Sequence, residues 1–179
     1  MPECVIIVDE SDREVGREEK LLAHRVPRLH RAFSVFVLDP NGRMLLQRRA
    51  AGKYHSSDLW SNACCGHPRP GEMSVEAAQR RLQEEMGFSC ELTHAGTVQY
   101  RLSVGADLEE HEYDHVFVGL FQGEPAPDPD EVGDWCWIDR ASLRQALERR
   151  PAEFTAWFRL VLDRLETSIM DGSVAVAAW

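Results

Sequence analysis

The chain has 179 residues, 44% of them hydrophobic and 28% charged, an ordinary composition for a globular protein that can bury a core without disulfides. Its formal net charge of −10 provides no basic field for nucleic acid or for an anionic membrane surface, so we expect neither partner. No apolar run approaches the roughly 20 residues that a membrane-spanning helix needs.

The five cysteines lack the spacing of a zinc finger or of a CxxC pair. Reduced thiols in a cytoplasmic protein are the simplest interpretation. The N-terminus, MPECVIIVDE, has no basic region and does not resemble a signal peptide. Since no repeat, low-complexity tract or interdomain linker interrupts the chain, we expect a single domain over residues 1–179.

The first third of the chain is rich in strand signals. A strand is predicted over Cys4 to Val8, and a short helix over Glu18 to Arg25, which Pro27 ends. A hairpin follows, because Asn41-Gly42 lies between two apolar runs. The two strands of this hairpin and the polar loop after it are predicted over His30 to Leu38, Arg43 to Gln47 and Arg48 to Asn62.

The segment from Ser61 to Phe88 joins a small-residue stretch, a Gly/Pro loop and a helical pattern over Ser74 to Met86, ending at about 87. Glu85 lies at the edge of the apolar stripe, where a carboxylate can hold a hard cation at the floor of a cleft. An amphipathic helix with a solvated charged face is the competing interpretation. The stripe itself, which should face the core, consists of Val75, Ala78, Leu82 and Met86.

Strands outnumber helices over the whole chain, and the two are mixed. This mixture predicts an α/β fold, an α/β/α sandwich around a mixed β-sheet. The tail from Gly172 to Trp179 gives no prediction. Strands after the Ser74 helix are predicted over Cys90 to Ser103, His111 to Phe121 and Trp135 to Asp139, and helices over Ala141 to Arg150 and Glu153 to Leu165.

Two carboxylates and three imidazoles form a candidate metal site. Glu110 and Glu112 stand two apart at the start of a strand and therefore share a face. The apolar run after them indicates that the strand becomes buried, which favours a cavity over a solvated surface. With His24, His30 and His67 they make a mixed N/O ligand set suited to manganese, zinc or iron. Each histidine alone would more simply be a structural or surface residue.

The spacing from Gly66 to Phe88 resembles the Nudix box of the diphosphate-handling Nudix superfamily, whose sandwich fold agrees with the prediction above. Arg81 stands where the usual pattern has a glutamate, an exchange that weakens metal loading and adds a phosphate-binding group. The segments HRVPRLH, CGHP and EHEYD, in this order and spacing, are similar to type 1 isopentenyl-diphosphate isomerases, a non-hydrolytic branch of the superfamily. The resemblance runs from about Lys20 to Trp157.

The resemblance implies a catalytic pair, Cys65 and Glu112, with Tyr100 and Trp157 beside the reacting carbons. It implies Mn2+ or Zn2+ on the histidine and glutamate set, Mg2+ carried to the substrate diphosphate by Glu85, and Cys65 among the metal-binding positions. The implied phosphate contacts are Lys20, Arg49, Lys53 and Arg81. Two of these four positions hold the only lysines of the chain.

The implied reaction moves the double bond of isopentenyl diphosphate to make dimethylallyl diphosphate, by adding one proton and removing another. Its cation-like intermediate calls for aromatic faces and a dry pocket. The alternatives are a Nudix hydrolase of a nucleoside diphosphate derivative and a non-catalytic binding domain. The acid and the base within the pair stay unassigned. A monomer or a weak homodimer is expected, and Lys53 in a long loop suggests a lid.

Overall fold

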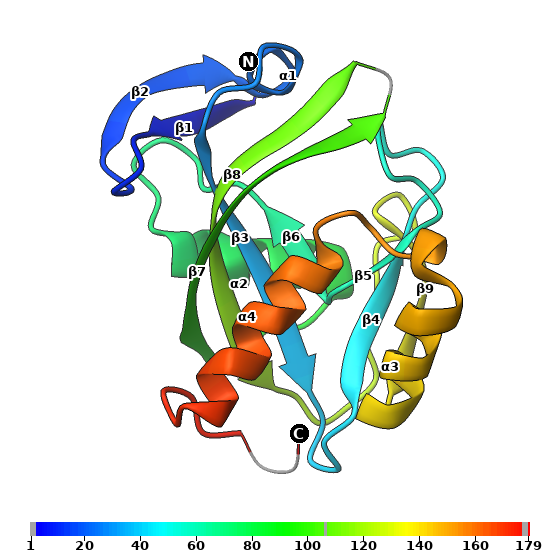
Figure 1. The fold of residues 1–179 in the computed structure, drawn as a ribbon. Helices are drawn as coiled ribbons and strands as arrows, with labels where there is room; N and C mark the ends of the chain where they lie inside the picture. Colours follow the sequence, from blue (N-terminus) through cyan, green and yellow to red (C-terminus); the bar gives the residue numbers. More distant parts are fainter. Residues whose placement is uncertain (1–2, 106, 177–178) are drawn as a thin grey trace.

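The computed structural model describes residues 3–105, 107–176 and 179, and within them the strands form one mixed sheet with helices on both faces (Figure 1). Strand β3 (His30–Leu38) is the centre of the sheet. β8 (Leu108–Leu120) runs parallel to it, while β6 (Cys64–Gly66), β4 (Met44–Arg49) and β1 (Cys4–Val8) pair with it antiparallel. The predicted sandwich is confirmed.

The remaining strands extend this centre in both directions. β7 forms a long antiparallel hairpin with β8, β9 and β5 pair with β4, and β2 pairs with β1. Their bounds are Glu14–Glu19 for β2, Trp60–Ser61 for β5, Leu92–Gly105 for β7 and Val132–Ile138 for β9.

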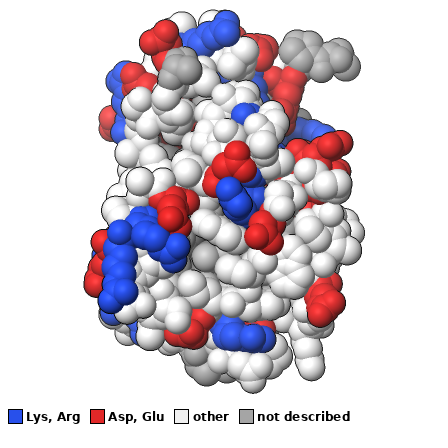
Figure 2. Space-filling view, turned by 90° about the vertical axis from the view of Figure 1, so that its right-hand side faces the viewer, with Lys and Arg blue, Asp and Glu red and all other residues white. Residues whose placement is uncertain are grey.

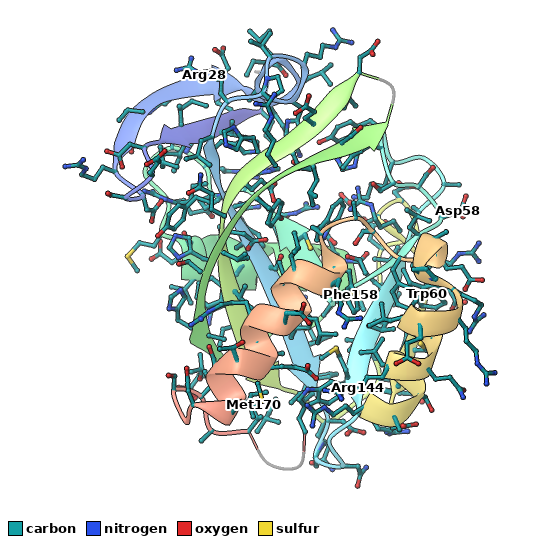
Figure 3. All side chains as sticks on the ribbon, viewed as in Figure 1. Arg28, Asp58, Trp60, Arg144, Phe158 and Met170 are labelled. Carbon is teal, nitrogen blue, oxygen red and sulfur yellow. The ribbon has the colours of Figure 1, made fainter. Side chains whose placement is uncertain are left out.

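Helices α2 (Ser74–Met86) and α4 (Phe158–Met170) cover opposite faces of the sheet, as Figures 1 and 3 show. The alternation of side chains along β3 divides the core accordingly. Val35 and Val37 pack in the cluster of α2, whereas Phe36 and Leu38 pack in the cluster of α4. The other helices are α1 (Lys20–Arg25), α3 (Arg140–Arg149) and the short 3-10 turn η1 (Pro151–Glu153).

Helix α2 matches its predicted range, and its end explains a glycine of the box. Gly87 has φ +76°, a left-handed conformation that ends the helix, and a Cβ there would lie 2.2 Å from the carbonyl oxygen of Ala126. No L-residue with a side chain fits this contact without displacing the Ala126 loop.

The predicted helix over Glu18 to Arg25 begins instead at Lys20. Glu18 and Glu19 end strand β2, which the sequence did not predict because EVGREE has no apolar alternation. Glu19 caps the helix, since its carboxylate accepts from the backbone N–H groups of Leu21 and Leu22, each at 2.9 Å.

The predicted final helix, Glu153 to Leu165, is also displaced and runs from Phe158 to Met170. After the 3-10 turn Phe154 is extended, and the N–H of Thr155 donates to the carbonyl of Trp60 at 2.9 Å, which keeps the chain out of the helix at this point. Trp157, predicted on the helix, is therefore the residue that precedes it.

Several segments outside the predicted strands are strands in the structure. β4 continues to Arg49 and β5 lies within the predicted loop over Arg48 to Asn62, while β6 follows at Cys64. β8 begins at Leu108, so Glu110 is already within the strand. Ala106, between the two predicted strands, lies outside the described residues. Residues 1–2 of the predicted leaderless N-terminus and 177–178 of the tail also lie outside them.

The described helices are too short or too polar to span a membrane. Cys64, Cys65, Cys90 and Cys136 are free thiols. On the face seen in Figure 2, basic and acidic side chains lie next to one another in small groups, rather than as one basic field.

Candidate active site

Strand register places three predicted site residues in one row. His30, the first residue of β3, pairs with Glu112 in parallel β8, and Glu112 pairs in turn with Tyr100 in β7. Directly paired residues of neighbouring strands point to the same face. Glu110 lies two residues before Glu112, so it shares that face, which is the one covered by α4.

The five predicted metal ligands come together around this row. One donor atom from each of His24, His30, His67, Glu110 and Glu112 lies within 4.8 Å of all the others. Nε2 of His24 is 2.8 Å from Oε2 of Glu110, and Nε2 of His67 is 2.8 Å from Oε1 of Glu112. Cys65, also predicted among the metal-binding positions, is not in this cluster.

The arrangement fits a divalent metal ion. The Nδ1–H groups of His24 and His30 donate to the carbonyls of Lys20 and Arg28, at 2.6 and 2.8 Å, so both Nε2 lone pairs face the cluster. His24 Nε2 and Glu110 Oε2 are buried and close, yet neither makes a hydrogen bond. Two buried ligand atoms that lie close together without a hydrogen bond indicate a cation shared between them.

The charge states of His67 and Glu110 agree with this interpretation, whereas Glu110 raises the pKa of His24 against the effect of burial, so a metal would have to displace a proton there. Burial lowers the pKa of His67 to about 4, so its imidazole is neutral and can act as a ligand. Although burial opposes it, the neighbouring imidazoles of His24 and His55 keep the pKa of Glu110 well below its usual value. Neutral imidazoles and ionised carboxylates are the forms that bind metals.

Strand alternation distinguishes the two adjacent cysteines. Cys64 is fully buried in the cluster beneath α2, whereas Cys65 points to the other face and lines the cleft. The Cys65 thiol donates to Oδ1 of Asn62 at 3.1 Å, and its sulfur lies 3.7 Å from Oγ of Ser34. Burial raises the pKa of Cys65 to about 12, so the resting group is a thiol.

A buried network connects Cys65 with Glu112. Oγ of Ser34 donates to Oδ2 of Asp114 at 2.8 Å, and the hydroxyl of Tyr100 lies 2.9 Å from the same oxygen. Tyr100 also donates a short hydrogen bond to Oε2 of Glu112. Burial and the neighbouring Glu112 raise the pKa of Asp114 to about 8. The sequence analysis missed Asp114, although it continues the alternation of Glu110 and Glu112.

Trp157 forms one wall of the cleft, on the side of α4. Its side chain is buried, and the guanidinium of Arg49 lies over its ring, 5.5 Å from the centroid. The ring of His55 meets it edge-on at 5.9 Å. The wall is therefore aromatic, with the Arg49 guanidinium lying over it.

The four predicted phosphate contacts, Lys20, Arg49, Lys53 and Arg81, all line this same cleft. Three of them are paired with carboxylates of the protein. Nζ of Lys20 is 3.0 Å from Glu3, Nη2 of Arg81 is 3.1 Å from Glu131, and Lys53 makes a short ion pair with Glu131. The sequence analysis missed Glu3 and Glu131, which carry no local pattern that would distinguish them from surface acids.

Glu85, the predicted magnesium ligand, is a buried carboxylate between polar partners. Its Oε1 accepts from Nη2 of Arg81 at 2.6 Å, and its Oε2 accepts from Nε2 of Gln47 at 2.9 Å. Both Glu85 and Arg81 line the cleft, as the edge position on α2 predicted.

His55 is a fourth histidine in the cleft that the sequence analysis did not single out. Its side chain is 5% exposed, and its Nε2 lies 3.1 Å from Oε1 of Glu110. Within the predicted polar loop, only its tertiary position distinguishes it from a surface histidine.

Comparisons with known proteins identify the family. Residues 28–158 match the NUDIX domain family. An isopentenyl-diphosphate Delta-isomerase of Serratia proteamaculans is 48% identical over 178 residues, covering 99% of each chain. An isopentenyl-diphosphate Delta-isomerase 2 of Aromatoleum aromaticum is 52% identical, covering 92% of this chain and 87% of its own.

Solved structures support the fold alone. The crystal structure of DR0079 from Deinococcus radiodurans has a TM-score of 0.74 at 18% identity, covering 90% of this chain and 98% of its own. A MutT protein of Methanosarcina mazei has a TM-score of 0.64 at 21% identity, covering 82% and 96%. With the domain match and near-complete relatives at about half identity, the chain belongs to the Nudix superfamily and, within it, to the isopentenyl-diphosphate Delta-isomerase family.

Proposed function

We infer that the protein is an enzyme that isomerises isopentenyl diphosphate to dimethylallyl diphosphate, a step of isoprenoid biosynthesis. The observation that carries this inference is the pairing of relatives of that name, about half identical over nearly the whole chain, with a cleft that contains both Cys65 and Glu112.

The two proton transfers are assigned to Cys65 and Glu112. One of the pair gives a proton to C4 of the substrate, and the other takes a proton from C2, so the double bond moves from C3–C4 to C2–C3 with no net gain of protons. Their strands, β6 and β8, pair with opposite edges of β3. The two groups therefore approach a substrate in the cleft from different sides.

The intermediate carries positive charge at C3 and must be protected from water. Trp157 offers an aromatic wall, and Tyr100, buried and hydrogen-bonded to Glu112, holds that carboxylate in place. Burial of the cleft residues keeps bulk water away from the reacting carbons.

We propose that His24, His30, His67, Glu110 and Glu112 hold Mn2+ or Zn2+. Their orphaned and neutral donor atoms support a divalent ion. When bound, the ion would polarise the Glu112 carboxyl and fix its orientation. Cys65, with a thiol of raised pKa, is assigned to proton transfer, and its proposed contact with a metal is secondary.

The diphosphate is assigned to Lys20, Arg49, Lys53 and Arg81, with Mg2+ held by Glu85. Four cations at one end of a cleft in a chain of net charge −10 form a local anion site. Arg81 and Glu85 are neighbours on α2, so the guanidinium would bind phosphate oxygens beside the carboxylate that would hold Mg2+.

The alternative, a Nudix hydrolase of a nucleoside diphosphate derivative, is not favoured. The relatives' names argue against it, and Arg81 occupies the place of a metal-loading glutamate. We further propose a single domain over 1–179, a cytoplasmic location, a monomer or weak homodimer, and no nucleic-acid or membrane partner.

The test is incubation with isopentenyl diphosphate, Mg2+ and Mn2+ in D2O, followed by NMR, for the wild type and Cys65→Ala. The wild type should form dimethylallyl diphosphate that contains deuterium and should release no phosphate. Cys65→Ala should lose both the product and the deuterium uptake. Phosphate release from a nucleotide panel, with no migration of the double bond, would instead identify a hydrolase.

A further inference from the structure

His55 lies in the loop between β4 and β5, two residues after Lys53, and its side chain turns inward to the cleft. The loop is held in an unusual conformation. Ser56 and Asp58 have φ of +51° and +60°, the left-handed region that non-glycine residues rarely adopt. Asp58 marks the outer edge of this loop in Figure 3. Backbone strain of this kind persists where the surrounding structure requires it.

The hydrogen bonds of His55 define its tautomer. Nε2 lies 3.1 Å from Oε1 of Glu110, and Nδ1 lies 3.1 Å from Oγ of Ser56. An ionised carboxylate only accepts hydrogen bonds, so Nε2 carries the proton and Nδ1 accepts from the Ser56 hydroxyl. His55 is also outside the group of five donor atoms within 4.8 Å. It is therefore not itself a ligand.

The two oxygens of Glu110 have separate surroundings. Oε2 faces Nε2 of His24 at 2.8 Å without a hydrogen bond, within the ligand cluster. Oε1 points the other way, to His55. Hydrogen bonds to the outer atoms of metal ligands orient those ligands and tune their affinity.

We propose that His55 is a positioning residue that holds Glu110 for the metal and thereby couples metal binding to the loop that carries Lys53. It donates to the outer oxygen of Glu110, which leaves Oε2 for the ion. The proposal deepens the proposed function and rests on it for the roles of the metal and of Lys53.

The loop also reaches the phosphate end of the cleft through His55. Its carbonyl accepts from Nη2 of Arg49 at 3.3 Å, and Arg49 lies over Trp157. A shift of His55 would therefore move Lys53 and release Arg49 together. In this way, metal binding orders the loop before the diphosphate arrives.

The first experiment measures the Mn2+ affinity of metal-free protein by competition with a chromophoric chelator. We expect His55→Phe, which keeps a ring against Trp157 and Tyr54, to bind Mn2+ roughly 10–100-fold more weakly. His55→Asn and His55→Gln form a matched pair of amides, because only the glutamine amide can reach the position of Nε2. Gln should restore the affinity and Asn should not.

Tyr54→Phe is the control within the same loop, and its affinity should equal that of the wild type. An unchanged affinity in both His55→Phe and His55→Asn would overturn the proposal. If His55→Phe fails to fold, the Mn2+ affinities of His55→Gln and His55→Asn still test the proposal. This titration needs no turnover. A lack of isomerase activity would therefore refute the proposed function, while the result for His55 would stay valid.

The second experiment follows hydrogen exchange of residues 50–59 with and without saturating Mn2+. In the wild type Mn2+ should slow the exchange, and in His55→Phe at saturation this slowing should be lost. Equal exchange rates in the wild type with and without metal would refute the coupling to the loop.

Discussion

The cleft has two ends that are built differently. At the metal end, His30 and Glu112 stand on paired strands of the central sheet, so backbone register determines their separation. At the phosphate end, Lys20 begins a short helix, Lys53 lies in a loop and Arg81 lies on α2. Their side chains stay 18–23% exposed, whereas those of His24 and His30 are fully buried.

The two ends also satisfy their charges differently. The ligands of the metal end contact one another and need a cation to complete them. The cations of the phosphate end are already paired with Glu3, Glu131 and Glu85. We infer that the metal end is preorganised, whereas diphosphate binding at the other end exchanges one set of anionic partners for another.

The largest effect is expected for Cys65→Ala and Glu112→Gln, each of which removes a proposed proton-transfer group. We expect kcat to fall by roughly 10²–10⁴-fold with a smaller change in KM. Steady-state kinetics would measure both. Cys64→Ala is the matched control, because Cys64 faces the core beneath α2 and should affect stability alone. A similar loss of kcat in Cys64→Ala would contradict the assignment.

Removal of the metal should act directly on the metal end and reach the phosphate end only through the loop of His55 and Lys53. EDTA treatment should abolish turnover, and added Mn2+ should restore it. A ligand at 100 times its Kd stabilises the folded state by about 2.7 kcal/mol, so thermal unfolding should show a higher Tm with Mn2+. His67→Asn should lose most of this stabilisation. A metal-free protein with full activity would exclude the proposed role of the cluster.

Arg81→Glu restores the usual Nudix pattern and tests the phosphate end. A hydrogen bond to a charged partner contributes about 1.5–3 kcal/mol, so KM for isopentenyl diphosphate should rise roughly 10–150-fold. Mn2+ affinity at the histidine site, measured by titration, should stay the same. The KM of Arg81→Lys should lie between those of the wild type and Arg81→Glu, since lysine keeps the charge and loses the planar fork. Weakened Mn2+ binding in Arg81→Glu would show that Arg81, like the loop of His55, is coupled to the metal end.

The smallest effect is expected for Glu131→Gln, which removes the carboxylate that competes for Lys53 and Arg81. KM should decrease a few-fold, and more at low ionic strength, because partly exposed charges are screened by salt. Glu124→Gln, an exposed residue with the same change of charge, is the control. An increase in KM for Glu131→Gln would instead mean that Glu131 orders the cations for the substrate.

The fold and much of the metal end could be predicted from local sequence. Strand β3 and helix α2 matched their predicted ranges because apolar periodicity reports burial directly. Glu110 and Glu112 could be assigned to one face from their spacing alone. The start of the last helix could not, because the hydrogen bond from Thr155 to Trp60 spans most of the chain.

The sequence by itself determined the central strand and the box helix, and residue type and spacing indicated the set of histidines and carboxylates. The four cations were implied by the family resemblance. Only the tertiary structure decided that Asp114 joins Tyr100 to Ser34, that Glu131 neutralises Lys53, and that His55 turns inward to Glu110. The physical reason is that periodicity records whether a side chain is buried, whereas its partner depends on contacts between distant segments.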